Sequence, residues 1–187
     1  MQFTLHYRGP LKPSAKPAEK HELRRHFHVQ LQECWRQAPL SAFGELLQPP
    51  DLIANRNLSL LWQLHGFTFA PLVSERIHLV AELDVQVLWP QKPGAIITSG
   101  GDIDNRLKTL LDALKMPSEP TALPSGTQPQ AGEDPFFCLL EDDSLVTRLA
   151  VDTDRLLEPH VGPSEVELWV KVRTRQLHVL MGTIGLA

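Results

Sequence analysis

Charged side chains recur along one edge of the segment from Gly101 to Leu114. Read as a helix, the segment places Asp104, Lys108 and Asp112 four residues apart, so a carboxylate, an ammonium and a second carboxylate share an edge. Asp102 stands just before the first turn, where its side chain can cap free backbone N–H groups or reach outward. Three acids and one lysine therefore crowd one short helix.

Two interpretations of this helix compete. In the first, Asp102 is an N-cap and the remaining charges form solvated pairs that contribute about 0.2–0.5 kcal/mol each. In the second, Asp102 and Asp104 hold a hard divalent cation, since Mg²⁺ prefers oxygen ligands and needs only one or two carboxylates besides phosphate oxygens and water. A calcium loop fits worse because Leu107 stands where its sharp turn needs glycine.

A second acidic cluster follows downstream. Glu141, Asp142 and Asp143 lie between apolar residues, as at the start of a strand. Adjacent carboxylates repel one another and raise each other's pKa unless a cation or a hydrogen-bond donor compensates. The cluster is either part of a cation site or a solvated turn.

Together, the Asp-x-Asp-Asn-x-x-Lys-x-x-x-Asp-Ala-Leu helix and the Leu-x-Asp-Asp-Ser segment resemble the RusA family of Holliday-junction resolvases. The resemblance covers residues 77–172 well and the N-terminal part loosely. It implies a homodimeric endodeoxyribonuclease that uses Mg²⁺ or Mn²⁺ to hydrolyse branched DNA. It also implies roles for individual residues: metal-binding catalytic carboxylates Asp102, Asp104 and Asp143, the active-site lysine Lys108, and the supporting residues Asn105, Asp112 and Asp142.

A basic helix is expected near the N-terminus, over residues 18–37, where apolar residues keep helical spacing. Residues 1–36 hold seven Lys and Arg residues against three Glu, although the whole chain has a formal net charge of -4. The basic side chains either form a solvated face or contact nucleic-acid phosphates. The candidates for phosphate contact are Lys16, Lys20, Arg24 and Arg25.

The chain as a whole predicts a single α+β domain over residues 1–187, with a mixed β-sheet and two principal helices packed on it. The clearest strand runs from Leu79 to Trp89, where alternate residues are apolar. Residues 116–138 are rich in proline and form an insertion relative to the RusA pattern. We expect this insertion to be a mobile loop rather than a functional one.

Composition and sequence pattern also lead to expectations about cellular location and the state of the cysteines. No apolar run is long enough to cross a bilayer and the first residues lack the pattern of a signal peptide, so we expect a cytoplasmic protein without membrane contact. Two cysteines suggest reduced, packed thiols, with one disulfide as the alternative. The alternative to a nuclease is a catalytically silent nucleic-acid-binding or assembly protein of the same fold.

Overall fold

The computed structural model describes residues 1–51, 58–90, 103–158, 162–178, 180, 183 and 185–186. Asp102, one of the predicted metal ligands, lies outside these residues. The described residues form both helices and strands, which confirms the expected α+β class.

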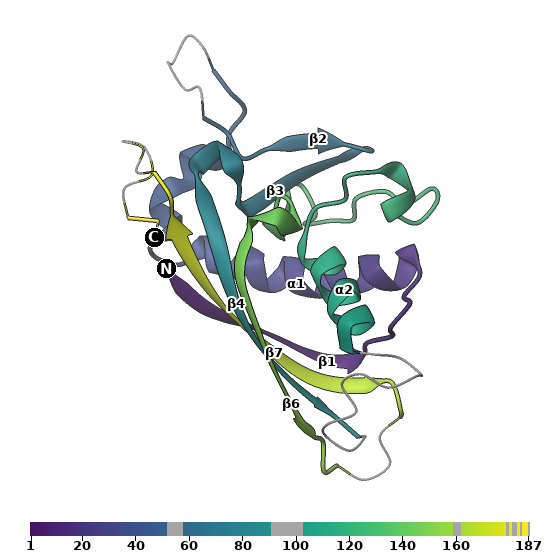
Figure 1. The fold of residues 1–187 in the computed structure, drawn as a ribbon. Helices are drawn as coiled ribbons and strands as arrows, with labels where there is room; N and C mark the ends of the chain where they lie inside the picture. Colours follow the sequence, from purple (N-terminus) through teal and green to yellow (C-terminus); the bar gives the residue numbers. More distant parts are fainter. Residues whose placement is uncertain are drawn as a thin grey trace.

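The larger sheet has four strands and runs through the middle of the molecule (Figure 1). Its order is β1 (Gln2–Pro10), β7 (Glu165–Gln176), β4 (Leu79–Trp89) and β6 (Val146–Arg155). β7 is antiparallel to both neighbours, whereas β4 and β6 are parallel, so the sheet is mixed. The alternation predicted for residues 79–89 is confirmed, because Leu79, Ala81 and every second residue after them are buried.

Three further strands among the described residues form a second sheet that is not hydrogen-bonded to the first. We had expected a single sheet. The second sheet contains β2 (Trp62–Leu64), β3 (Phe67–Val73) and β5 (Phe136–Leu140). His65 and Gly66 adopt positive φ angles of 53° and 84°, which allows the tight turn between β2 and β3. β5 then pairs in parallel with β3 instead of joining the larger sheet. This pairing joins segments far apart in the sequence, and local periodicity does not reveal such contacts.

Two helices, α1 (Pro17–Arg36) and α2 (Ile103–Leu114), lie on the same side of the larger sheet (Figure 1). α1 packs against β5 and α2. Its residues Leu23, Phe27 and Leu31 are at most 4% exposed and belong to the main hydrophobic core. Four short 3₁₀ helices complete the described elements: η1 (Leu40–Leu47), η2 (Glu75–Ile77), η3 (Pro120–Ala122) and η4 (Asp143–Leu145).

The proline-rich insertion packs on the protein, contrary to our expectation of a mobile loop. Its Leu123 is buried in a second hydrophobic cluster formed with Met116, Phe67, Phe69 and Phe136. Polar contacts with α1 hold the same segment from the other side. Apolar burial and hydrogen bonds together replace the regular secondary structure that this segment lacks.

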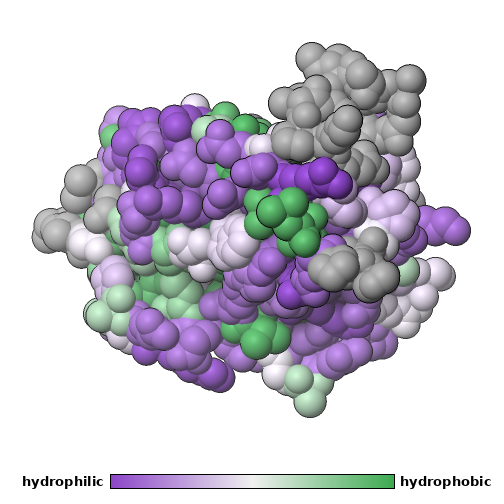
Figure 2. Space-filling model, turned by 90° about the horizontal axis from the view of Figure 1, so that it is seen from below, coloured by the Kyte–Doolittle hydropathy of each residue, from purple (hydrophilic) through white to green (hydrophobic). Residues whose placement is uncertain are grey.

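Three further features concern the surface, the cysteines and the length of the helices. The face in Figure 2 is mostly hydrophilic, and hydrophobic residues appear on it only in small groups. Cys34 and Cys138 are both free thiols, which confirms the expectation of reduced cysteines. Among the helices described, none is long and apolar enough to cross a membrane.

Candidate functional site

Helix α2 presents its predicted polar edge to solvent at its N-terminal half. Asp104, Asn105 and Lys108 are exposed, whereas Ile103 and Leu110 on the other side are buried. Asp104 Oδ1 accepts a hydrogen bond of 2.8 Å from the backbone N–H of Asn105. Within the described part of the chain, Lys108 forms no ion pair, so the solvated pairs expected between Lys108 and its acidic neighbours are absent.

The C-terminal half of α2 carries a network of ion pairs. Asp112 Oδ2 lies 2.6 Å from Lys20 Nζ of α1, and Asp112 Oδ1 lies 3.9 Å from Lys115 Nζ. Lys115 Nζ also donates a hydrogen bond of 2.9 Å to Asp143 Oδ2. Lys115 therefore joins the helix motif to the second acidic cluster.

Backbone contacts explain why these two motifs meet. The N–H of Met116 donates to the carbonyl of Leu140 at 2.9 Å, and Lys115 forms an isolated parallel bridge with Leu140. Glu141, Asp142 and Asp143 follow Leu140 directly, so the end of β5 delivers them to the end of α2. The pairing of two backbone segments thus fixes the place of the acidic cluster.

Asp142 has a local role at this junction. Its Oδ1 accepts a hydrogen bond of 3.0 Å from the backbone N–H of Ser144 and caps η4. Hydrogen bonds from the Ser144 side chain and backbone hold the pKa of Asp142 below its ordinary value. The charge of Asp142 is therefore stabilised mainly within its own turn, with a smaller contribution from the charge of Lys115.

Arg24 was expected to contact phosphate, and its position corrects that expectation. Arg24 is only 2% exposed, and its Nε and NH2 groups donate to the carbonyls of Lys115 and Asp112 at 3.1 and 2.7 Å. Burial lowers the pKa of its guanidinium. Arg24 therefore caps the C-terminal end of α2, where a cation also interacts favourably with the helix dipole.

The other basic residues of the N-terminal region differ in their availability. Lys16 is exposed, and its ammonium has no ion pair with another described residue. Lys20 is engaged by Asp112, and Arg25 pairs with Glu133 at 2.7 Å and with Glu22 at 3.0 Å. Lys16 is thus the basic candidate that remains uncommitted, while Lys20 and Arg25 would have to exchange or share partners to reach a phosphate.

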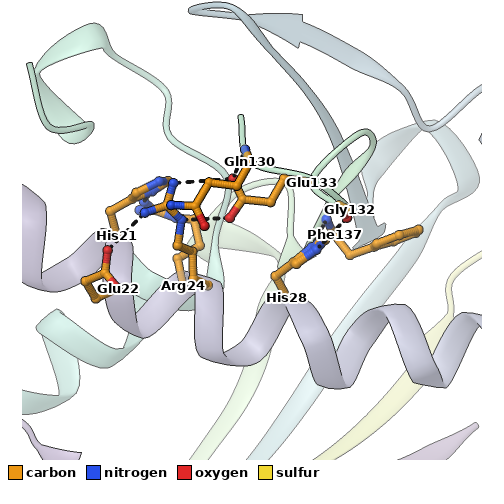
Figure 3. A network of polar contacts seen from close by, with 9 residues as sticks. His21, Glu22, Arg24, His28, Gln130, Gly132, Glu133 and Phe137 are labelled. Carbon is orange, nitrogen blue, oxygen red and sulfur yellow. Dashed lines mark hydrogen bonds and ion pairs between the residues drawn. The ribbon is translucent and has the colours of Figure 1, made fainter. Parts of the chain in front are cut away.

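A second polar network joins α1 to the insertion beside this site (Figure 3). Glu133 accepts hydrogen bonds from Arg25 Nε and from the backbone N–H of Gln130. Burial raises the pKa of Glu133, but these hydrogen bonds outweigh it and hold the pKa below its usual value. His28 Nδ1 accepts from the N–H of Phe137 at 2.8 Å, and His28 Nε2 donates to the carbonyl of Gly132 at 3.1 Å.

A pocket of about 200 Å³ opens next to the ion-pair network. Lys20, Asp112 and Lys115 contribute to its wall together with Ser118 and Thr121 of the insertion. The pocket wall therefore combines ammonium groups and hydroxyls with the carboxylates of Asp112 and Glu119, and a phosphate would have to compete with these acids for Lys20 and Lys115.

The two predicted metal ligands among the described residues, Asp104 and Asp143, lie toward opposite ends of α2. Asp104 and Asp112 are two helical turns apart, about 12 Å along the axis, and Asp143 adjoins the Asp112 end. Over the described ranges, no group of three or more His, Cys, Asp or Glu residues is placed to hold a metal ion. The three-carboxylate set with Asp102, Asp104 and Asp143 stays a prediction.

Sequence reasoning missed Lys115, which makes the central contact of the site. The available signal was its position three residues after Asp112, which continues the polar edge of α2.

Comparison with known proteins gave no match of this chain to a protein-family model, a curated protein or a solved structure. The resemblance to the RusA family therefore rests on the two motifs alone.

Proposed function

We propose that the protein is a metal-dependent endodeoxyribonuclease that hydrolyses phosphodiester bonds of branched DNA, such as Holliday junctions, and acts as a homodimer. One observation carries the proposal. Lys115 contacts both Asp112 and Asp143, so the helix motif and the second acidic cluster adjoin in space although 31 positions separate the two aspartates. A single active site built from both motifs requires this proximity.

The carboxylates suit a hard divalent cation in their chemistry. Asp104 is exposed and accepts one hydrogen bond from its own helix, and Asp143 is half-buried beside Lys115. To hold one Mg²⁺ or Mn²⁺ together with Asp102, Asp104 and Asp143 would have to approach one another, because they lie toward opposite ends of α2. The bound ion would polarise the scissile phosphate and lower the pKa of a water molecule. Asp143 would have to exchange or share its ion pair with Lys115 to serve as a ligand.

Lys108 and Lys16 would act on the DNA. Lys108 is exposed on the same edge of α2, and its ammonium would neutralise negative charge that develops on the phosphate during cleavage. Lys16 would contact a flanking phosphate, which positions the DNA without reading its sequence. Asn105, next to Asp104, would add an amide donor.

Cleavage of defined DNA tests the proposal. The wild-type protein should cut a labelled four-way junction in Mg²⁺ or Mn²⁺ in preference to nicked or linear duplex. Asp104→Asn and Asp143→Asn should abolish cleavage and retain the circular dichroism spectrum of the wild type, because each removes a ligand charge without changing side-chain size. Glu45→Gln, which neutralises an exposed acid in η1, should cleave like the wild type. Full activity of either aspartate variant contradicts the assignment.

A catalytically silent module that binds nucleic acid or assembles with other proteins is the second candidate. The observation that favours it is the network itself, because Lys20 and Lys115 already neutralise Asp112 and Asp143 and stabilise the fold without turnover. Retarded migration of the junction in a native gel, with no cleavage in either metal, would support this second function.

A further inference from the structure

The two outer strands of the larger sheet differ in how their free edges are covered. β1 is covered at His6, where Gln30 of α1 accepts a hydrogen bond of 2.9 Å from the backbone N–H and donates one of 2.7 Å to the carbonyl. His26 also contacts this carbonyl at 2.9 Å. Side chains of α1 thus satisfy the backbone groups at this point of the β1 edge.

β6 has no such cover from the described residues. It pairs with β4 on one side, and no other described segment forms a hydrogen bond with the backbone of its second edge. The strand is ten residues long and contains no Pro, Gly or Lys. Its four charged residues, Arg148, Asp152, Asp154 and Arg155, are two bases and two acids, so they can pair with one another between two copies. Leu149 on this strand is 42% exposed, which is high for a large apolar residue. β6 is therefore available to pair with another strand.

The sequence of β6 is complementary to itself in antiparallel orientation. A twofold axis through Ala150 places Arg148 opposite Asp152 of a second copy and Leu149 opposite Val151. Arg148 and Asp152 lie on the same face of the sheet, because their partners on β4 are Glu82 and Gln86, which are an even number of residues apart. The symmetric arrangement thus forms two identical ion pairs and two apolar pairs, with the small Ala150 on the axis.

We propose that two copies of the chain associate through antiparallel pairing of their β6 strands, centred on Ala150, so that their four-stranded sheets become continuous. Arg148 also contacts Asp84 within its own chain, and its five N–H donors suffice for two carboxylates. Pairing through backbone hydrogen bonds requires no broad apolar surface.

Other registers fit less well. Moving the axis to Val151 pairs Arg148 with Asp154 but places Asp152 opposite Ala150 and Leu149 opposite Thr153. Moving it to Leu149 leaves Arg148 opposite Ala150, without an acid. The register centred on Ala150 is the one of these three that matches charge with charge and apolar with apolar.

A charge-exchange experiment tests both the interface and its register. Sedimentation velocity at about 100 µM, far above a micromolar Kd, should show a wild-type dimer. Asp152→Arg and Arg148→Glu should each be monomeric, because each variant faces like charges across the axis. Mixing the two variants should restore a dimer, since only the mixed pair matches Arg with an acid at both positions. Asp154→Arg is the control and should remain dimeric.

A cysteine on the axis gives a second, independent readout. Ala150→Cys should form an intermolecular disulfide under mild oxidation, whereas Thr147→Cys, which faces Thr153 in this register, should not. The wild type controls for Cys34 and Cys138. A monomeric wild type, or a dimer that the charge variants leave intact, overturns the proposal. The inference rests on the homodimer of the proposed function, so a monomeric wild type would remove that part of it. None of these residues belongs to the candidate site, so cleavage by the Asp104 and Asp143 variants still tests the nuclease activity separately.

Discussion

At the scale of single residues, the arrangement of the site depends on Lys115. Its ammonium lies between Asp112 and Asp143, and its side chain is only 20% exposed. Half-buried ion pairs are screened less by salt than exposed ones, and they orient the groups that they join. Lys115 therefore determines where Asp143 lies relative to α2.

Replacement of Lys115 by Met should reduce the free energy of unfolding by about 1 kcal/mol, because Asp143 loses its partner while Asp112 keeps Lys20. Urea denaturation of Lys115→Met, Asp143→Asn and the double variant measures this. The sum of the losses in the free energy of unfolding in the two single variants should exceed the loss in the double variant by about 0.5–1 kcal/mol. Strictly additive effects would mean that the observed contact contributes no stability.

The buried histidines of α1 set a second residue-level property, the response of the fold to acid. Burial, followed by the charge of Arg24, lowers the pKa of His21 to about 4, and burial also lowers the pKa of His28. The neutral ring of His28 both accepts and donates a backbone hydrogen bond, so protonation would remove its acceptor. Both side chains are therefore stable in the fold as neutral rings.

The unfolded chain binds protons at His21 near pH 6.5, whereas the folded protein binds them only near pH 4. The stability contributed by the neutral ring is complete above pH 6.5 and declines as the pH falls toward 4. Between pH 7 and 4.5 this amounts to about 2–3 kcal/mol. Urea denaturation of wild type and His21→Phe at both pH values should show a smaller decline for the variant. Equal declines would contradict the assignment.

At the scale of elements, sequence periodicity predicted both helices and strand β4. The buried stripe of α2 and the alternation of β4 are local patterns, and both elements formed within one or two residues of the expected limits. The insertion has no such pattern. Its position depends on single anchoring residues, Leu123 in an apolar cluster and Glu133 beside Arg25, and on partners distant in sequence. Composition alone therefore suggested a mobile loop.

Removal of the apolar anchor should release the insertion. Leu123→Ala should lower the free energy of unfolding by about 2–3 kcal/mol, because Leu123 is only 6% exposed and its loss leaves a cavity among aromatic rings. A protease of broad specificity should then cut residues 116–138 faster than in the wild type. Leu157→Ala, at a side chain that is 82% exposed, is the control and should change neither property.

At the scale of the whole molecule, α1 connects the parts that the candidate site needs. Lys20 and Arg24 reach the end of α2, and Arg25 and His28 reach the insertion. The two acidic motifs could be found from sequence, and the structure brings Asp143 to the Asp112 end of α2, at Lys115. The separation of Asp104 from Asp143 could not be predicted from the sequence, because it depends on how β5 meets α2 in three dimensions.

Metal binding to the whole protein can be measured without any substrate. If the carboxylates of the two motifs share one ion in the folded state only, free Mg²⁺ or Mn²⁺ at ten times its Kd stabilises the fold by about 1.4 kcal/mol and raises the Tm by roughly 3–6 °C. Asp104→Asn and Asp143→Asn should each lose this increase, whereas Glu45→Gln should keep it. An unchanged Tm for the wild type at millimolar ion, combined with junction binding without cleavage, would favour the silent module. An increase that survives both aspartate variants would place the ion elsewhere, since each variant removes one of its proposed ligands.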